Sequence, residues 1–103
     1  MNRDYIYVNV NRLENGMCCL VIRPEFRTNK DDIHLNKAYK RACIQVDDYL
    51  RRNKYKPTVS NGIIYLNKPI VSEKRFFGYI KDIINKEFRF LDAYVVTAND
   101  KLR

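Results

Sequence analysis

The beginning of the chain alternates apolar and polar positions. Ile6, Val8 and Val10 are separated by single polar or amphipathic residues, a period of two that indicates a strand with one buried face. A second apolar run, 17–22, follows Asn15-Gly16, and this dipeptide between two such runs predicts a β-hairpin.

Two registers of this hairpin compete. A two-residue turn at Asn15-Gly16 pairs Val10 with Val21. A three-residue loop, with Gly16 in the left-handed conformation, pairs Val10 with Leu20 and sets apolar side chains together on one face, so we prefer it. We expect Pro24 to weaken or end the second strand, because proline cannot donate to the ladder.

A helical pattern follows, between 31 and 53. Its apolar positions recur at intervals of three and four: Leu35, Ala38, Tyr39, Ala42, Val46, Tyr49 and Leu50. We expect Asp31 and Asp32 to begin this helix, with Asn36 as the alternative cap. The pairs Asp47–Arg51 and Asp48–Arg52 have the i,i+4 spacing that supports a helix, and Pro57 prevents its continuation.

The second half repeats the order of hairpin and helix. Asn61-Gly62 predicts a hairpin over 58–66, and Ser72 is a suitable cap for a second helix. The apolar face of that helix consists of Phe76, Phe77, Ile80, Ile83, Ile84 and Phe88. Gly78 lies inside it at a cost of about 1 kcal/mol against Ala, which we attribute to a close approach to the sheet. We expect a last strand over 90–97 and a frayed tail over 98–103.

These elements predict one α+β domain over 1–103. The order β-β-α-β-β-α-β fits a two-layer sandwich, with a mainly antiparallel sheet and both helices on one face. The chain has 103 residues, of which 46% are hydrophobic and 31% charged. That composition supports one modest core without a metal or disulfide bonds.

Charge points to the kind of partner. The net charge is +8, which favours polyanions such as nucleic acid, an anionic membrane or an acidic protein surface. The sequence shows no secretory signal and no membrane-spanning run, and its cysteine count is odd, so we expect an intracellular, cytoplasmic protein that acts without a membrane. Small basic proteins rich in Asn, Ile, Lys and Tyr are common products of phages and mobile elements.

The densest cluster of cations is the segment 51–56, which contains Arg51, Arg52, Lys54, Tyr55 and Lys56. Such cations contact phosphates, and the aromatic ring can stack on a base. Lys37, Lys40 and Arg41 extend the charge along the non-core side of the helix. The competing interpretation is a solvated helix end, because cations are favoured at a helix C-terminus by the dipole alone.

The sheet face opposite the helices is the second candidate surface. Strand alternation places Tyr5, Tyr7, Asn9, Asn11, Met17, Cys19, Val21 and Arg23 on it. Aromatic and amide side chains on an open sheet are typical of single-strand binders. The same face could equally bind a partner protein or a second copy of the chain.

Catalytic signals are weak. The sequence lacks a glycine-rich phosphate loop, a Ser-His-Asp arrangement and the Cys spacing of zinc sites, so we predict no cofactor and no metal. His34 is the single histidine. The acidic pairs Asp31-Asp32 and Asp47-Asp48 suggest a metal-dependent nuclease, but capping and i,i+4 pairing explain them. Cys18 and Cys19 face opposite sides of a strand, and we expect Cys18 in the core and Cys19 as an exposed thiol.

The sequence therefore predicts a non-enzymatic binding protein. Our first hypothesis is nucleic-acid binding with low sequence specificity, with the segment 51–56 on phosphates and Tyr55, Tyr5 and Tyr7 stacking on bases. The alternative is an inhibitor or adaptor that binds a partner protein through its sheet face or edge. A small metal-dependent nuclease is the third hypothesis.

Overall fold

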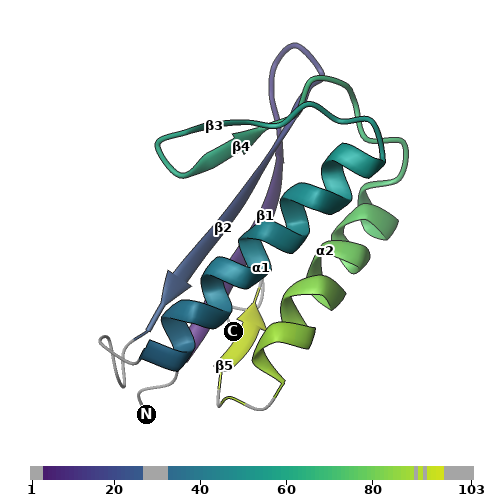
Figure 1. Ribbon diagram of the computed structural model, residues 1–103. Helices are drawn as coiled ribbons and strands as arrows, with labels where there is room; N and C mark the ends of the chain where they lie inside the picture. The colour runs from purple at the N-terminus through teal and green to yellow at the C-terminus, as the bar shows by residue number, and fades with distance from the viewer. Residues whose placement is uncertain (1–3, 27–32, 90, 92, 97–103) are drawn as a thin grey trace.

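In the part of the chain that the structure describes, five strands and two helices make up the fold (Figure 1). The computed structural model describes residues 4–26, 33–89, 91 and 93–96. Its elements are β1 (Asp4–Arg12), β2 (Cys18–Glu25), α1 (Ile33–Arg52), β3 (Thr58–Ser60), β4 (Ile63–Tyr65), α2 (Glu73–Phe88) and β5 (Ala93–Val96). The sheet order is β3-β4-β2-β1-β5. The first four of these strands are antiparallel and β5 runs parallel to β1, so the predicted α+β class is confirmed.

The first hairpin has the preferred register. Val10 pairs with Leu20 and Val8 with Ile22. Leu13 N donates to Met17 O at 2.7 Å, and Gly16 has a φ of +83°. The three-residue loop is confirmed, and Gly16 takes the left-handed conformation that other residues disfavour.

Pro24 does not itself end β2, which continues one residue further, to Glu25. The strand β4 pairs only with Cys19–Val21, which leaves the edge of β2 beyond Val21 without a strand partner among the described residues. Ile22 O lies on that edge, where it accepts a hydrogen bond from Tyr39 Oη at 2.9 Å. Pro24 has the same strand parity as Ile22, so the missing N–H faces the unpaired edge and disrupts no ladder bond.

The second hairpin is a two-residue turn. Asn61 and Gly62 have φ values of +52° and +76°, and Ser60 pairs with Ile63 directly across the turn. Positive φ at both central residues matches the twist of the flanking strands. Three-residue strands keep this hairpin short, which is why it leaves part of β2 open.

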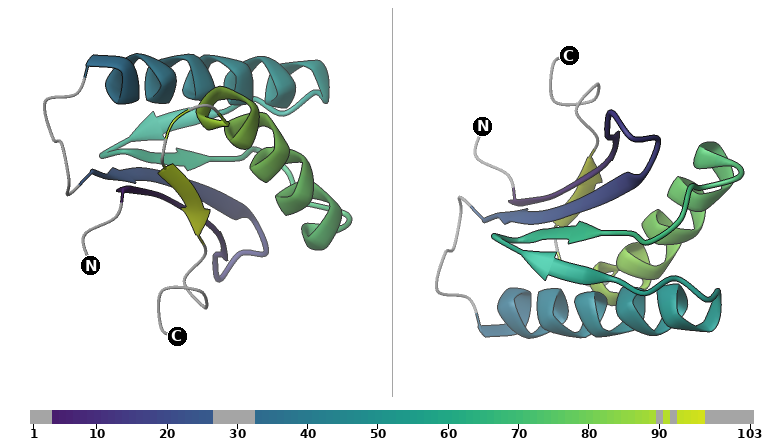
Figure 2. Two further views of the ribbon diagram at one scale, coloured as in Figure 1. Left: turned by 90° about the horizontal axis from the view of Figure 1, so that it is seen from below. Right: turned by 90° about the horizontal axis from the view of Figure 1, so that it is seen from above.

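Both helices lie on the same side of the sheet and run beside each other (Figures 1 and 2). Their buried faces share one core with β1 and β2, as predicted from periodicity: Ile6, Val8, Leu20, Ile22, Leu35, Ala38, Ala42, Val46, Leu50, Phe76, Ile80, Ile84 and Phe88. None of the described helices is long and apolar enough to cross a membrane.

Helix boundaries were predicted in part. Ser72 caps α2, where its Oγ accepts from Arg75 N at 3.4 Å. Helix α1 has begun by Ile33, so the alternative cap Asn36 was wrong. Asp31 and Asp32 lie outside the described residues, as does the tail 98–103.

Gly78 is not explained by a close helix–sheet approach. A Cβ at this position would meet no atom within 4 Å, so that expectation was wrong. The described part of the last strand is Ala93–Val96, which pairs in parallel with β1. The strands that α2 connects, β4 and β5, run in the same direction on the two sides of β2 and β1, as a crossover through a helix allows.

Candidate functional site

The C-terminus of α1 ends in a Schellman motif. Tyr55 N donates to Leu50 O at 2.9 Å and Lys54 N to Arg51 O at 3.0 Å, the two bonds that define this cap. Lys54 has a φ of +66°, in the left-handed region where glycine is usual. The cap turns the chain sharply and projects Lys54 from the end of the helix.

Two loops are held together beyond this cap. Lys56 N donates to Asn67 Oδ1 at 2.8 Å, and Lys68 Nζ donates to Asn53 O at 3.0 Å. Lys68 Nζ also lies 4.6 Å from the centre of the Tyr55 ring, within the range of a cation–π contact. The loop after β4 therefore adds a cation to the segment 51–56.

We call this surface the cationic pole and define it as Arg51, Arg52, Lys54, Lys56 and Lys68. Arg51 Nε bonds Asp47 Oδ2 at 2.8 Å, as predicted. Arg52 Nε donates instead to the backbone carbonyl of Asp48 at 3.4 Å, so the predicted pairing of the Asp48 and Arg52 side chains was wrong. The ammonium groups of Lys54 and Lys56 form no ion pair with any described residue. Both are exposed, so an external anion can reach them.

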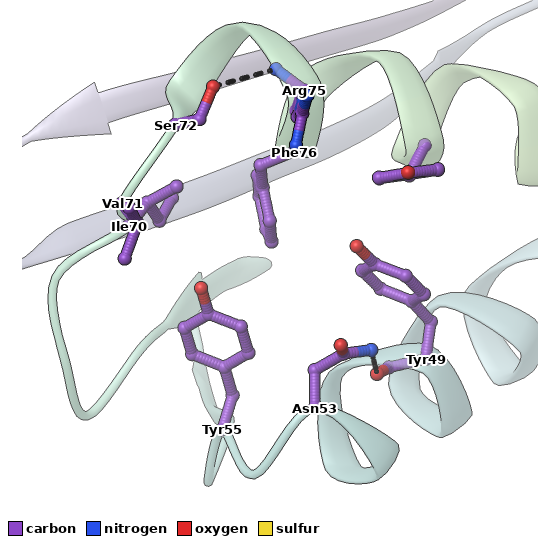
Figure 3. Close-up of a pocket in the computed structure, with 9 residues that line it drawn as sticks. Tyr49, Asn53, Tyr55, Ile70, Val71, Ser72, Arg75 and Phe76 are labelled. Carbon is purple, nitrogen blue, oxygen red and sulfur yellow. Dashed lines mark hydrogen bonds between the residues drawn. The ribbon is translucent and has the colours of Figure 1, made fainter.

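A pocket of about 260 Å³ lies beside the cationic pole, between the end of α1 and the start of α2 (Figure 3). We call it the aromatic pocket; it is lined by Tyr49, Asn53, Tyr55, Ile70, Val71, Ser72, Arg75, Phe76 and Tyr79. Phe76 and Ile70 are buried and form its floor. The Phe76 ring centre lies 6.3 Å from that of Tyr49 and 5.8 Å from that of Tyr55.

The aromatic pocket is open to solvent on the side formed by Tyr79. Tyr79 is 54% exposed, and its ring centre lies 5.9 Å from that of Tyr49 with an interplanar angle of 39°. Burial raises the pKa of both Tyr49 and Tyr55 above the usual value of a phenol. Their hydroxyls therefore stay protonated at neutral pH and can donate as well as accept hydrogen bonds.

The other basic side chains of α1 are not part of the cationic pole. Arg41 Nε forms an ion pair with Glu87 Oε2 of α2 at 2.9 Å. Lys37 and Lys40 are exposed. At 1.5 Å rise per residue they lie roughly 16–22 Å along the helix from Arg51 and Arg52. The structure thus separates these three predicted residues from the segment 51–56.

The surface of the strands away from the helices is also open, and we call it the outer sheet face. By strand alternation and register it carries Tyr5, Tyr7, Asn9, Asn11, Cys19, Val21, Arg23, Ile63 and Tyr65. The Arg23 guanidinium lies 4.8 Å from the Tyr7 ring centre and 3.5 Å from Glu25 Oε1. Tyr5 and Tyr7 therefore lie on the opposite side of the sheet from the helices that carry the cationic pole, and cannot join Tyr55 in one site.

Among the described residues, the cysteine and acidic side chains do not gather into a site. Cys18 is in the core, as predicted, but Cys19 is only 4% exposed, so the expected exposed thiol was wrong. Cys19 lies on an interior strand with register partners on both sides, Asn11 and Tyr65. Burial raises the pKa of the Cys43 thiol. Within the described residues, no three His, Cys, Asp or Glu side chains form a group that could hold a metal ion.

No family model, curated protein or solved structure matches this chain. Sequence patterns found the segment 51–56 but missed Lys68, Arg75 and Tyr79, which come from the loop after β4 and from α2. Only an exposed aromatic next to the apolar stripe of α2 could have hinted at Tyr79.

Proposed function

We propose that this chain is a non-enzymatic domain that binds nucleic acid with low sequence specificity through the cationic pole. The observation that carries the proposal is that Lys54, in the cap of α1, and Lys56, just after it, have no carboxylate partner among the described residues. Lys68 is fixed beside them by two contacts. Such a cluster of separate cations can neutralise the phosphates of a nucleic acid, and the release of the counterions condensed on that nucleic acid favours the complex.

The same geometry supports the low sequence specificity that we propose. Lysine ammonium groups act as point charges that position a phosphate backbone, whereas sequence is read by side chains on base edges. No described helix presents a row of base-reading side chains at the cationic pole, because Arg51 and Arg52 bond back to the helix itself. We expect affinity for DNA and RNA alike.

Binding of labelled single- and double-stranded DNA and RNA by fluorescence anisotropy tests this. With three or four phosphate contacts, the affinity should fall about 20- to 150-fold between 50 and 200 mM salt. The triple variant Arg52→Ala, Lys54→Ala, Lys56→Ala should reduce the log–log salt slope by about 2 to 3.

The matched control removes the same charge elsewhere. The variant Lys37→Ala, Lys40→Ala, Lys86→Ala replaces three exposed lysines far along the helices from the cationic pole, and should bind nearly as the unmodified chain does. Equal losses of affinity in both variants would mean that binding depends on net charge alone and not on the cationic pole. Absence of binding at 50 mM salt, or binding that ignores salt, would refute it.

A second candidate function is recognition of an extended peptide at the edge of β2. Beyond Val21 this edge has no strand partner among the described residues, and a pocket of about 320 Å³ lies there, lined by Val21, Ile22, Arg23, Pro24, Tyr39, Asn61, Gly62 and Ile63. Strand addition to a free edge is a common mode of partner binding. A defined stoichiometric complex with a partner protein, formed without nucleic-acid affinity, would favour this function over the first.

A further inference from the structure

The aromatic pocket and the cationic pole are neighbours, and the contact between them is Tyr55. One side of its ring is occupied by the Lys68 ammonium at 4.6 Å, and its ring also packs edge-on against Phe76 at 5.8 Å. Asn53, whose backbone carbonyl accepts from Lys68, lines the same pocket. A strand whose phosphates lie on the cationic pole would therefore bring its bases to the mouth of the pocket.

We infer that the aromatic pocket receives one unpaired nucleobase, so that the protein prefers single strands to duplexes. The inference rests on the proposed function, because the phosphates of the same strand must be held at the cationic pole. It adds the class of nucleic acid and the part of the nucleotide that is recognised.

Size and lining favour a base as the occupant. At about 260 Å³ the pocket is smaller than those that enclose a drug-sized ligand, and suits a single flat ring system. Its floor is apolar, with Phe76 and Ile70, and its wall includes the half-exposed ring of Tyr79. A solvent-exposed ring next to an apolar floor gives a base a surface on which to stack.

Polar groups at the rim match the edge of a base. The Asn53 amide nitrogen donates to Tyr49 O at 2.7 Å, which leaves its amide oxygen as an acceptor at the rim. The Tyr49 and Tyr55 side chains point into the pocket (Figure 3), and their hydroxyls form no hydrogen bond with any described residue. The Arg75 guanidinium forms no ion pair with a described residue, and can contact a base or its phosphate.

Paired bases cannot use this pocket. A base inside a duplex is stacked on both faces and bonded along its edge, so only an unstacked base can enter. Because every base has a flat aromatic face, stacking tolerates all four bases. The pocket therefore distinguishes single from double strands without reading sequence.

The test compares three probes by anisotropy: a thymidine oligomer of about twelve nucleotides, an abasic oligomer with the same number of phosphates, and the corresponding duplex. The thymidine oligomer should bind about 5- to 150-fold more tightly than the abasic oligomer. In the variant Tyr79→Ala this advantage should shrink at least severalfold, with the salt slope unchanged. The variant Tyr79→Phe, which keeps the ring, should bind as the unmodified chain does.

The variant Tyr65→Ala is the matched control, because it removes a partly exposed tyrosine from the outer sheet face. It should leave the preference for the thymidine oligomer intact. Equal affinity for the thymidine and abasic oligomers, or full affinity of Tyr79→Ala, would overturn this inference while salt-dependent binding still supported the proposed function. Failure of all three probes to bind would overturn both.

Discussion

The cationic pole and the outer sheet face contain the same kinds of residue but use them differently. On the outer sheet face, Arg23 lies over the Tyr7 ring and bonds Glu25, so its charge is matched within the protein. At the cationic pole, Lys68 also lies over a tyrosine ring, but its hydrogen-bond partner is a neutral backbone carbonyl. Because neither of these partners carries a negative charge, they do not compensate the charge of Lys68.

This difference shows that a count of aromatic and basic residues does not locate a binding surface. What matters is whether cations without an anion in their own structure lie close together, as Lys54, Lys56 and Lys68 do in the part of the chain that the structure describes. Arg41 is paired with Glu87 and Arg51 with Asp47, whereas Lys54 and Lys56 have no such partner among the described residues. The field that attracts a polyanion therefore comes from a small part of the total charge of +8.

The largest expected effect is a loss of stability, and its size should differ between the two regions. The variant Phe76→Ala should lower the free energy of unfolding by about 3–5 kcal/mol, because it empties a buried site at the floor of the aromatic pocket. Tyr65→Ala on the outer sheet face should cost much less, since Tyr65 is 37% exposed. Urea denaturation of both variants measures the difference, and equal losses would contradict this distinction.

A substitution at the helix cap should affect stability and binding in opposite directions. Lys54→Gly relieves a left-handed residue and should raise the free energy of unfolding by about 1 kcal/mol. It also removes a cation, so affinity for nucleic acid should fall. Thermal unfolding and anisotropy on the same sample test both signs. A stabilised variant with undiminished affinity would show that Lys54 does not contact phosphate.

The unpaired edge of β2 is stabilised by the hydroxyl of Tyr39, and removing that hydroxyl tests its contribution. The variant Tyr39→Phe leaves Ile22 O without its donor, and should lower the free energy of unfolding by about 0.5–1.5 kcal/mol. Hydrogen exchange should become faster in β2 near this position. If nucleic-acid affinity fell as well, the binding surface would have to extend to this edge, against the proposal.

The smallest expected effect concerns the matched charge of the outer sheet face. Arg23→Ala removes a cation–π contact and a partly exposed ion pair, and should cost about 0.5–1 kcal/mol of stability. Its effect on affinity for a single strand should be less than about twofold, in contrast to the variants of the cationic pole. A loss as large as that of the triple variant would remove the distinction between the two surfaces.

Local sequence signals predicted much of the fold. Asn61-Gly62 and the cap at Ser72 act over a few residues, and the hairpin register followed from the apolar positions of two adjacent strands. Cys19 and Gly78 could not be placed in this way, since their surroundings depend on how distant elements pack. Cys19 is covered because β4 adds to the far side of β2. Gly78 has no crowded neighbour at all.

The same limit applies to the candidate site. The segment 51–56 is contiguous, so its charge is visible in the sequence. The aromatic pocket combines that segment with Ile70, Phe76 and Tyr79, which meet it only because α1 and α2 pack side by side. Hydrophobic periodicity assigned Phe76 correctly to the core but gave no reason to place it beneath a pocket.

The proposed nucleic-acid-binding surface can be mapped directly, residue by residue. We would titrate the isotopically labelled protein with a short thymidine oligomer and follow its backbone amide signals by nuclear magnetic resonance. Binding at the cationic pole and the aromatic pocket should shift signals in the loop after α1, at Lys68 and at the start of α2, and leave the strands of the outer sheet face unchanged. Shifts confined to Tyr5, Tyr7, Val21 and Tyr65, or no shifts at low salt, would contradict it.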